Sequence, residues 1–199
     1  MRFVGLDVSY RNVGLVILDQ TGVCLLSQHL KNPADSDPKG FTWHRDTASS
    51  LFLPDDVVSI EGLSFGSIGK THVLAGAHAM WLEQAAAQSH LVFVPVPMRV
   101  KIWATGSAKA SKSEMIAWAK SELGSMAPPK ISEHEADALS LAQIALNGYF
   151  IVEGRKLDLP THRQQLFYHP KKTGLLEVEG RSFHRGRHGK RSSIDAGKA

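Results

Sequence analysis

Two apolar segments at the N-terminus, residues 2–8 and 13–19, constrain the fold more than any other part of the chain. Both are short and rich in Val, Ile and Leu, and a Ser-Tyr-Arg-Asn turn separates them, so they predict an antiparallel pair of strands. Asp7 lies near the end of the first segment. A carboxylate at the end of a buried strand is costly unless it binds a cation or a proton. The segments therefore predict a hairpin within a buried sheet, with an ionisable site at one end.

The rest of the chain alternates between strand and helix patterns. A hairpin followed by such alternation predicts an α/β fold, with a mixed central β-sheet flanked by α-helices. We find no internal repeats. The expected strands are residues 22–30, 56–61 and 91–96, the expected helices are residues 41–51, 71–88, 111–123 and 133–147, and the expected loops are residues 32–40 and 62–69.

Composition and length narrow the protein class. The 199 residues suffice for one domain with an appendage, and 43% hydrophobic with 21% charged residues is typical of a soluble globular protein. The single Cys24 excludes an internal disulfide and fits a reducing compartment. The apolar runs are too short to span a bilayer. The first strand leaves no room for a signal peptide, so we expect a cytoplasmic protein, in a host cell if it is viral, with no membrane partner.

Charge divides the chain into two parts. Residues 1–152 carry 12 Lys/Arg and 14 Asp/Glu, whereas residues 153–199 carry 11 Lys/Arg and 5 Asp/Glu. We predict a compact domain over 1–152 and a partly disordered basic extension over 153–199. Such a run suits non-specific phosphate contact, although it could also be a solvated tail without a partner. The extension's predicted DNA contacts are Arg181, Arg185, Arg187, Lys190 and Arg191.

Four side chains occur in an order that suits a metal site: Asp7, Glu61, His134 and Asp137. Glu61 ends an apolar strand pattern, as Asp7 does. His134 and Asp137 are three apart and so share one face of the last core helix. Three carboxylates and an imidazole that converge would form a two-metal site for phosphodiester cleavage.

Each of the first three residues also has an interpretation without chemistry. Asp7 can accept amide hydrogen bonds in a tight turn. Glu61 can pair with a lysine, and His134 can be a satisfied histidine at a helix end. The order of the residues along the chain, rather than any one of them, favours the functional interpretation.

The last core helix has a well-specified start. Ser132 and Glu135 form a capping-box pattern, and Glu133 and Glu135 are first-turn acids that suit the helix dipole. This explanation does not reach Asp137, which lies among Ala and Leu. Glu133 or Glu135 is an alternative to His134 as the fourth ligand.

In this order the motifs resemble those of RuvC-type Holliday junction resolvases, a branch of the RNase H-like nucleases. The resemblance covers residues 1–147. Residues 3–9 resemble the strand with the first carboxylate, residues 60–62 resemble the strand with the second, and residues 134–139 resemble the closing motif. In that motif the family has Asp or His first and Asp last.

A basic segment adds to the resemblance. Residues 100–108 and 112–113 resemble the family's segment in which two lysines contact DNA near the cut, and Lys101 and Lys112 are the matching positions. The family often places an aromatic wedge after the second carboxylate, which makes Phe65 a DNA-binding candidate, with core packing as the alternative. Tyr10 and Trp103 are weaker candidates for contact near the site.

The resemblance implies an RNase H-like fold and cleavage of four-way junctions or other branched DNA. Asp7, Glu61, His134 and Asp137 would hold two Mg²⁺ ions, for which Mn²⁺ should substitute. Lys101 and Lys112 would neutralise the scissile phosphate, and Lys112 would thereby join the catalytic residues. The protein would act as a homodimer, and the apolar helix over 71–88 could pack on its twin or in the core.

Other classes remain open from the sequence. One is a different RNase H-like nuclease, such as a transposase or an enzyme that cuts RNA–DNA hybrids. Another is a fragment of an actin-like kinase, although a second nucleotide-binding lobe is missing. A third is a non-catalytic DNA-binding protein that uses its basic extension.

Overall fold

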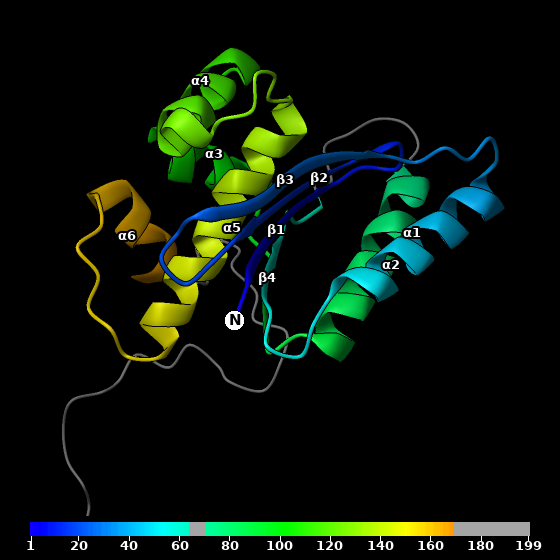
Figure 1. Ribbon diagram of the computed structural model, residues 1–199, viewed down its shortest axis with the longest axis horizontal. Helices are drawn as coiled ribbons and strands as arrows, with labels where there is room; N and C mark the ends of the chain where they lie inside the picture. Colours follow the sequence, from blue (N-terminus) through cyan, green and yellow to red (C-terminus); the bar gives the residue numbers. More distant parts are fainter. Residues whose placement is uncertain (64–70, 169–199) are drawn as a thin grey trace, which may run out of the picture.

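A five-stranded mixed sheet forms the centre of the molecule (Figure 1). The structure, a computed structural model, describes residues 1–63 and 71–168. The strand order is β3-β2-β1-β4-β5, in which the first three strands are antiparallel neighbours and β1, β4 and β5 run parallel. The strands are β1 (Phe3–Val8), β2 (Asn12–Leu18), β3 (Cys24–Lys31), β4 (Val57–Ile60) and β5 (Leu91–Phe93).

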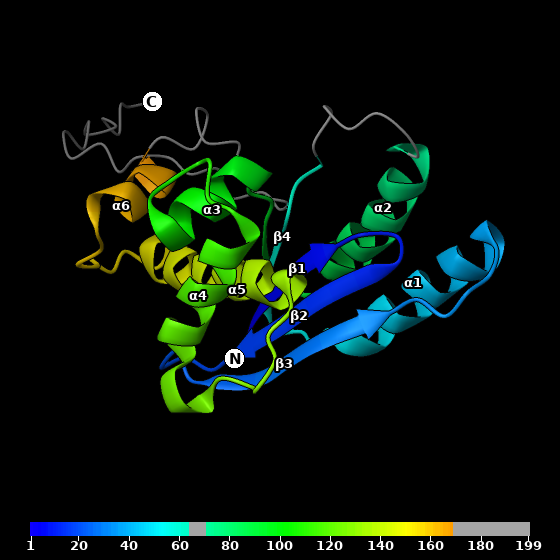
Figure 2. The same cartoon turned by 90° about the horizontal axis from the view of Figure 1, so that it is seen from above.

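Helices cover both faces of this sheet. Helices α1 (Asp37–Leu51) and α2 (Thr71–Gln88) pack on one face, and α5 (Glu133–Val152) packs on the other with α3 (Pro97–Thr105) and α4 (Lys112–Leu123) beside it (Figures 1 and 2). A short 3₁₀ helix, η1 (Gly124–Met126), follows α4, and α6 (Thr161–Tyr168) follows α5. The three-layer α/β arrangement confirms the predicted fold class.

Helix α5 lies directly on the hairpin because two glycines leave room for its backbone. A Cβ atom added to Gly5 on β1 would lie 2.0 Å from the carbonyl oxygen of Ala138, and one added to Gly14 on β2 would lie 2.0 Å from that of His134. Side chains at these positions would push the helix away from the sheet. The glycines thus set how closely the start of α5 approaches the end of β1.

Replacing Gly5 with alanine is expected to lower the free energy of unfolding by at least about 2 kcal/mol, because backbone atoms of α5 cannot move aside locally. Gly76→Ala is the comparison, since an added Cβ there meets the Phe41 ring, a side chain that can shift, at 2.8 Å. Urea titration of both variants measures the difference. Equal losses for the two variants would contradict the close-approach explanation.

Several element boundaries differ from those expected. Helix α1 starts at Asp37 rather than 41, because Pro38 is tolerated in a first turn. Helix α5 runs past Gly148 to Val152; this glycine does not end the helix but lets Phe93 approach, with an added Cβ 2.7 Å from its ring. Helices α3 and α6 were not expected. In α3, Pro97 starts a helix instead of only ending a strand.

Of the two alternatives for the helix over 71–88, the core alternative is confirmed for four of its apolar residues. Val73, Ala77, Trp81 and Ala85 are buried within the chain itself. The Trp81 indole also donates a hydrogen bond of 2.9 Å to the fully buried His44. These residues belong to the core of the chain itself and cannot contact a second copy of the protein.

The beginning of the basic extension packs on the compact body. Leu166 and Phe167 of α6 are buried in the core cluster on the α5 side of the sheet.

Among the described residues, no helix combines the length and the apolar character that a membrane span requires. Residues 169–199 lie outside the described residues, and with them the predicted contacts Arg181, Arg185, Arg187, Lys190 and Arg191.

Candidate active site

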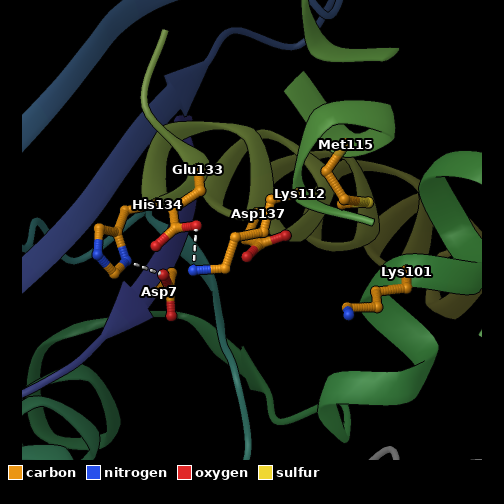
Figure 3. Close-up of a pocket in the computed structure, with 7 residues that line it drawn as sticks. All are labelled: Asp7, Lys101, Lys112, Met115, Glu133, His134 and Asp137. Atoms are coloured by element: carbon orange, nitrogen blue, oxygen red, sulfur yellow. Dashed lines mark hydrogen bonds and ion pairs between the residues drawn. The ribbon is translucent and has the colours of Figure 1, made fainter. Parts of the chain in front are cut away.

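Four of the five predicted catalytic residues, together with Lys101, line one cavity of about 150 Å³ (Figure 3). It lies where the end of β1 meets the first turns of α5, with α3 and α4 on its other side. The residues that form it lie up to 130 positions apart in the sequence, from Asp7 to Asp137. The lining side chains are Asp7, Lys101, Lys112, Met115, Glu133, His134 and Asp137.

Asp7 and His134 form a close pair across the β1–α5 contact. The Nδ1 atom of His134 lies 2.5 Å from Oδ2 of Asp7, and this contact raises the pKa of the imidazole above its usual value. Asp7 is nearly buried, with 8% of its surface exposed. The alternative interpretation, in which Asp7 only accepts amide hydrogen bonds in a turn, is therefore wrong, because its carboxylate faces His134 of α5.

The ring of His29 on β3 lies beside the imidazole of His134. Its ring centroid lies 5.3 Å from that of His134, and its Nε2 atom lies 2.9 Å from Oδ1 of Asn12. Sequence reasoning missed this neighbour. The pairing of β2 with β3 could have predicted it. His29 pairs with Gly14 on β2, and the backbone of α5 passes close to Gly14 at His134.

Asp137 points into the cavity with an unsatisfied oxygen. Its Oδ1 atom is buried and has no hydrogen-bond partner among residues 1–63 and 71–168. Burial, followed by the nearby charge of Asp7, raises the pKa of this carboxyl to about 7. A buried carboxyl without a donor is costly, so the position suits an external cation or a proton.

Glu61 lies immediately after β4, beside Asp7. Its backbone N–H donates to the Leu6 carbonyl at 3.1 Å, which continues the pairing of β4 with β1. Glu61 does not line the cavity, but burial and the charges of Asp7 and Asp137 raise the pKa of its carboxyl well above the usual value. Its backbone carbonyl lies 2.9 Å from Nε2 of His78 on α2, which fixes the strand end.

The two candidate replacements for His134 are distinguished by their contacts. Glu135 is occupied, because its carboxylate completes the predicted capping box with Ser132 and accepts from Ser27 at 3.0 Å. Glu133 instead lines the cavity and pairs with Lys112, with Nζ 2.6 Å from Oε2. Glu133 therefore stays an alternative ligand, whereas Glu135 serves the helix start.

The acidic groups are gathered but not arranged as a closed coordination sphere. Within residues 1–63 and 71–168, no three His, Cys, Asp or Glu side chains come together in a way that could hold a metal ion. This differs from the expected convergence of four ligands. One physical reason is that His134 Nδ1 is bonded to Asp7, and another is that neighbouring carboxylates repel one another unless a cation or protons neutralise them.

The donor chemistry of these residues nevertheless suits a hard divalent cation. Three carboxyl groups supply the oxygen ligands that Mg²⁺ prefers. Two of them, Glu61 and Asp137, have pKa values raised by burial and by their acidic neighbours, and the buried oxygen of Asp137 lacks a donor in the described structure. A bound cation would relieve each of these conditions.

No protein-family model matches the chain, and no curated protein matches it by sequence. The solved structure of Thermus thermophilus RuvC matches with a TM-score of 0.59 and 21% identity, over 77% of this chain and 97% of that one. T. thermophilus RuvC in complex with Holliday junction substrate matches with a TM-score of 0.60 and 21% identity, over 77% and 96%. The chain has the RuvC fold.

The match covers nearly all of the T. thermophilus chain but only about three-quarters of this chain. The expectation of an RNase H-like architecture is therefore confirmed. The remaining quarter of the chain is additional to the RuvC fold. At 21% identity the likeness concerns architecture, and the roles of individual residues stay predictions.

Of the aromatic candidates, Tyr10 and Trp103 lie within the described residues, and the ring of Tyr10 packs against those of Phe41 and His44. Trp103 is 1% exposed and donates from Nε1 to Gln143 at 3.0 Å, so the expectation that it contacts a ligand near the site is wrong. It was missed as a core residue because α3 was not recognised as a helix. Phe65 lies outside the described residues.

Proposed function

We propose that the protein is a structure-selective, metal-dependent endodeoxyribonuclease that cleaves Holliday junctions or related branched DNA, acting in recombination, repair or genome processing. The observation that carries this proposal is the cavity at the end of β1, where Asp7, His134 and Asp137 face the cationic side chains of Lys101 and Lys112 (Figure 3). The RuvC fold around the cavity supports it.

The charges in the cavity suit a phosphodiester substrate. Lys101 comes from α3 and Lys112 from α4, opposite the acidic side chains of β1 and α5. Lysines on one side would neutralise phosphate, and carboxylates on the other would hold cations. A non-catalytic DNA-binding surface would have no use for buried carboxyl groups next to its phosphate contacts, because they repel the backbone.

The proposed division of labour uses the side chains in place. Asp7, Glu61 and Asp137 would hold two Mg²⁺ ions, or Mn²⁺, which when bound supply Lewis acidity at the scissile phosphate and activate a water. His134, fixed by Asp7, would orient that water or join the ligands. Lys112 would break its ion pair with Glu133 and would then neutralise the scissile phosphate. Lys101 would hold the DNA backbone beside that phosphate.

A direct assay tests this function. The protein is incubated with Mg²⁺ and an end-labelled four-way junction, in parallel with matched duplex, flap and RNA–DNA hybrid. We expect cleavage of branched DNA that is abolished by EDTA. Preferential cleavage of the hybrid would identify a different RNase H-like nuclease, and binding without cleavage of any substrate would identify a DNA-binding protein.

The imidazole predicts a dependence on pH. Activity is expected to fall as the pH drops below the raised pKa of His134, since the protonated ring can neither accept a proton nor bind a cation. His134→Asp should retain activity and extend it to lower pH, because a carboxylate ionises there. Rates of both proteins across the acidic and neutral pH range measure this. An inactive but folded Asp variant would favour Glu133 as the fourth ligand.

The distal part of the basic extension, residues 181–199, predicts an effect on binding rather than on chemistry. Deleting residues 181–199 should weaken binding to junction and duplex alike, and flatten its salt dependence in proportion to the number of phosphates that the deleted segment neutralises. The single-turnover rate at saturating protein should change little. Binding titrations across a salt series, paired with these rates, provide the measurement. Loss of the chemical step itself would show that the extension belongs to the site.

Homodimerisation and a cytoplasmic location complete the proposal. Symmetric cleavage of a four-way junction needs two active sites, which a dimer would supply. With the buried residues of α2 excluded, a dimer would use other surfaces, and sedimentation of the protein with and without junction DNA tests it.

A further inference from the structure

Helix α6 is attached to α3, the helix that carries Lys101. The Phe167 ring packs edge-on against the Trp103 indole, with ring centroids 5.8 Å apart. Both side chains are buried, as is Leu166. Helix α6, which lies in the basic extension, thus packs against a helix of the candidate site.

Arg163 makes the most specific of these contacts. Its Nε atom donates to the Trp103 carbonyl at 3.0 Å, and its guanidinium lies 4.9 Å from the centroid of the Trp103 ring. A second nitrogen pairs with Glu122 of α4 at 3.2 Å. With 16% of its side chain exposed, Arg163 bridges α3 and α4. Gln143 of α5 completes the network, since it accepts from the Trp103 indole and donates to Glu122.

Helix α3 depends on such contacts for its position. It has nine residues, fewer than an isolated helix needs to be stable in water. The carbonyl of Trp103 is one of the four at the end of the helix that have no partner within it, and Arg163 satisfies it. On the α5 side, Ser140 donates to the Val100 carbonyl at 2.9 Å.

Lys101 lies between these two attachment points. It extends from α3 toward the cavity (Figure 3). Trp103, two residues further, is buried. Residues two apart on a helix point in roughly opposite directions. Holding the Trp103 side therefore fixes the direction in which Lys101 leaves the helix.

We infer that Arg163 is a positioning residue: by clamping α6 onto the end of α3, it holds Lys101 at the cavity, so the first part of the basic extension acts on the chemical step and not on DNA affinity alone. This inference rests on the proposed function. It assigns α6 a role distinct from that of the basic cluster over 181–191.

The test compares two arginine variants of the full-length protein. Arg163→Ala is expected to lower the single-turnover cleavage rate about tenfold at saturating protein, the scale of losing a supporting contact in a metal-dependent site. Arg155→Ala is the matched control. It removes the same charge from the same extension and the same kind of stacking, since Arg155 lies 4.4 Å from the Phe150 centroid, but this contact is made to α5. Its rate should equal that of the wild type.

A double-mutant cycle shows whether the effect passes through Lys101. In a Lys101→Ala background, Arg163→Ala should reduce the rate by less than about twofold further, because its target is already gone. Arg163→Lys, which keeps the charge but lacks the planar fork, should behave like the alanine variant if the geometry of the clamp matters. Multiplicative losses in the double variant would overturn the inference, as would an equal loss in Arg155→Ala.

A second readout does not need activity. Lysines are reductively methylated with ¹³C, and the Lys101 signal is assigned by its loss in Lys101→Arg. We expect Arg163→Ala to shift or broaden this signal and Arg155→Ala to leave it unchanged. An unchanged Lys101 signal in Arg163→Ala would refute the clamp, whether or not the wild type cleaves DNA. A shifted signal in a wild type that cleaves none of the substrates would support the clamp while the proposed nuclease function fails.

Discussion

Asp7→Asn is expected to reduce cleavage of a four-way junction by at least about 10³-fold, the scale of losing a preorganised electrostatic group. Asparagine preserves the shape of the side chain, and its carbonyl oxygen can still accept from His134. It removes the charge that would hold a cation between β1 and α5. Junction binding measured without divalent cations should persist or tighten, because one anionic group facing the phosphates is lost.

Asp55→Asn is the control for this loss, because Asp55 is an exposed aspartate in the turn before β4. Its cleavage rate should match that of the wild type. Gel-based cleavage rates and binding titrations on the same junction provide both measurements. Near-normal cleavage by Asp7→Asn would exclude the two-metal assignment.

Asp137→Asn is expected to stabilise the metal-free protein at mildly alkaline pH by about 2 kcal/mol. The pKa of the folded carboxyl, about 7, lies above its ordinary value of 3.8. Between these values the folded protein keeps a proton that the unfolded chain has released, so the free energy of unfolding falls as the pH rises. A full shift of this size corresponds to about 4 kcal/mol, and we expect about half because neighbouring groups share the protons.

Urea titrations in EDTA, from the ordinary pKa of the carboxyl to just above its folded pKa, measure this dependence. The wild type should lose stability across the range, and Asp137→Asn should lose less of it, with the remainder due to Glu61. Adding Mg²⁺ at the alkaline end should stabilise the wild type more than the variant. An unchanged slope in Asp137→Asn would show that this carboxyl is not the group that titrates.

The sheet and the acidic part of the site could be predicted because their signals are local. Apolar runs that end at Asp7 and Glu61 identify two strands. A capping box at Ser132 fixes the phase of α5, which places His134 and Asp137 on one face. Periodicity and the cost of burying charge single out these residues one by one, and their order along the chain, which resembles that of RuvC-type resolvases, joins them into one site.

The remaining features depend on contacts between distant segments. Nothing in the pattern around Pro97 distinguishes the start of a helix from the end of a strand, so α3 and the burial of Trp103 were missed. Helix α6 is short and weakly patterned, and it forms where Leu166 and Phe167 find a surface made by α3 and α5. The ion pair between Lys112 and Glu133 joins residues whose approach is decided by helix packing.

That ion pair has a consequence for how DNA affinity would respond to salt. A lysine that is free in solution attracts mobile anions, and a phosphate that binds it sheds mobile cations, which is why affinity falls as salt increases. Lys112 already carries its counter-charge in Glu133, 2.6 Å away. A phosphate that takes the place of Glu133 leaves a bare carboxylate that recruits a cation from solution. Exchange of one anion for another at Lys112 would then add almost nothing to the salt slope, and an estimate of bound phosphates from that slope would be too low.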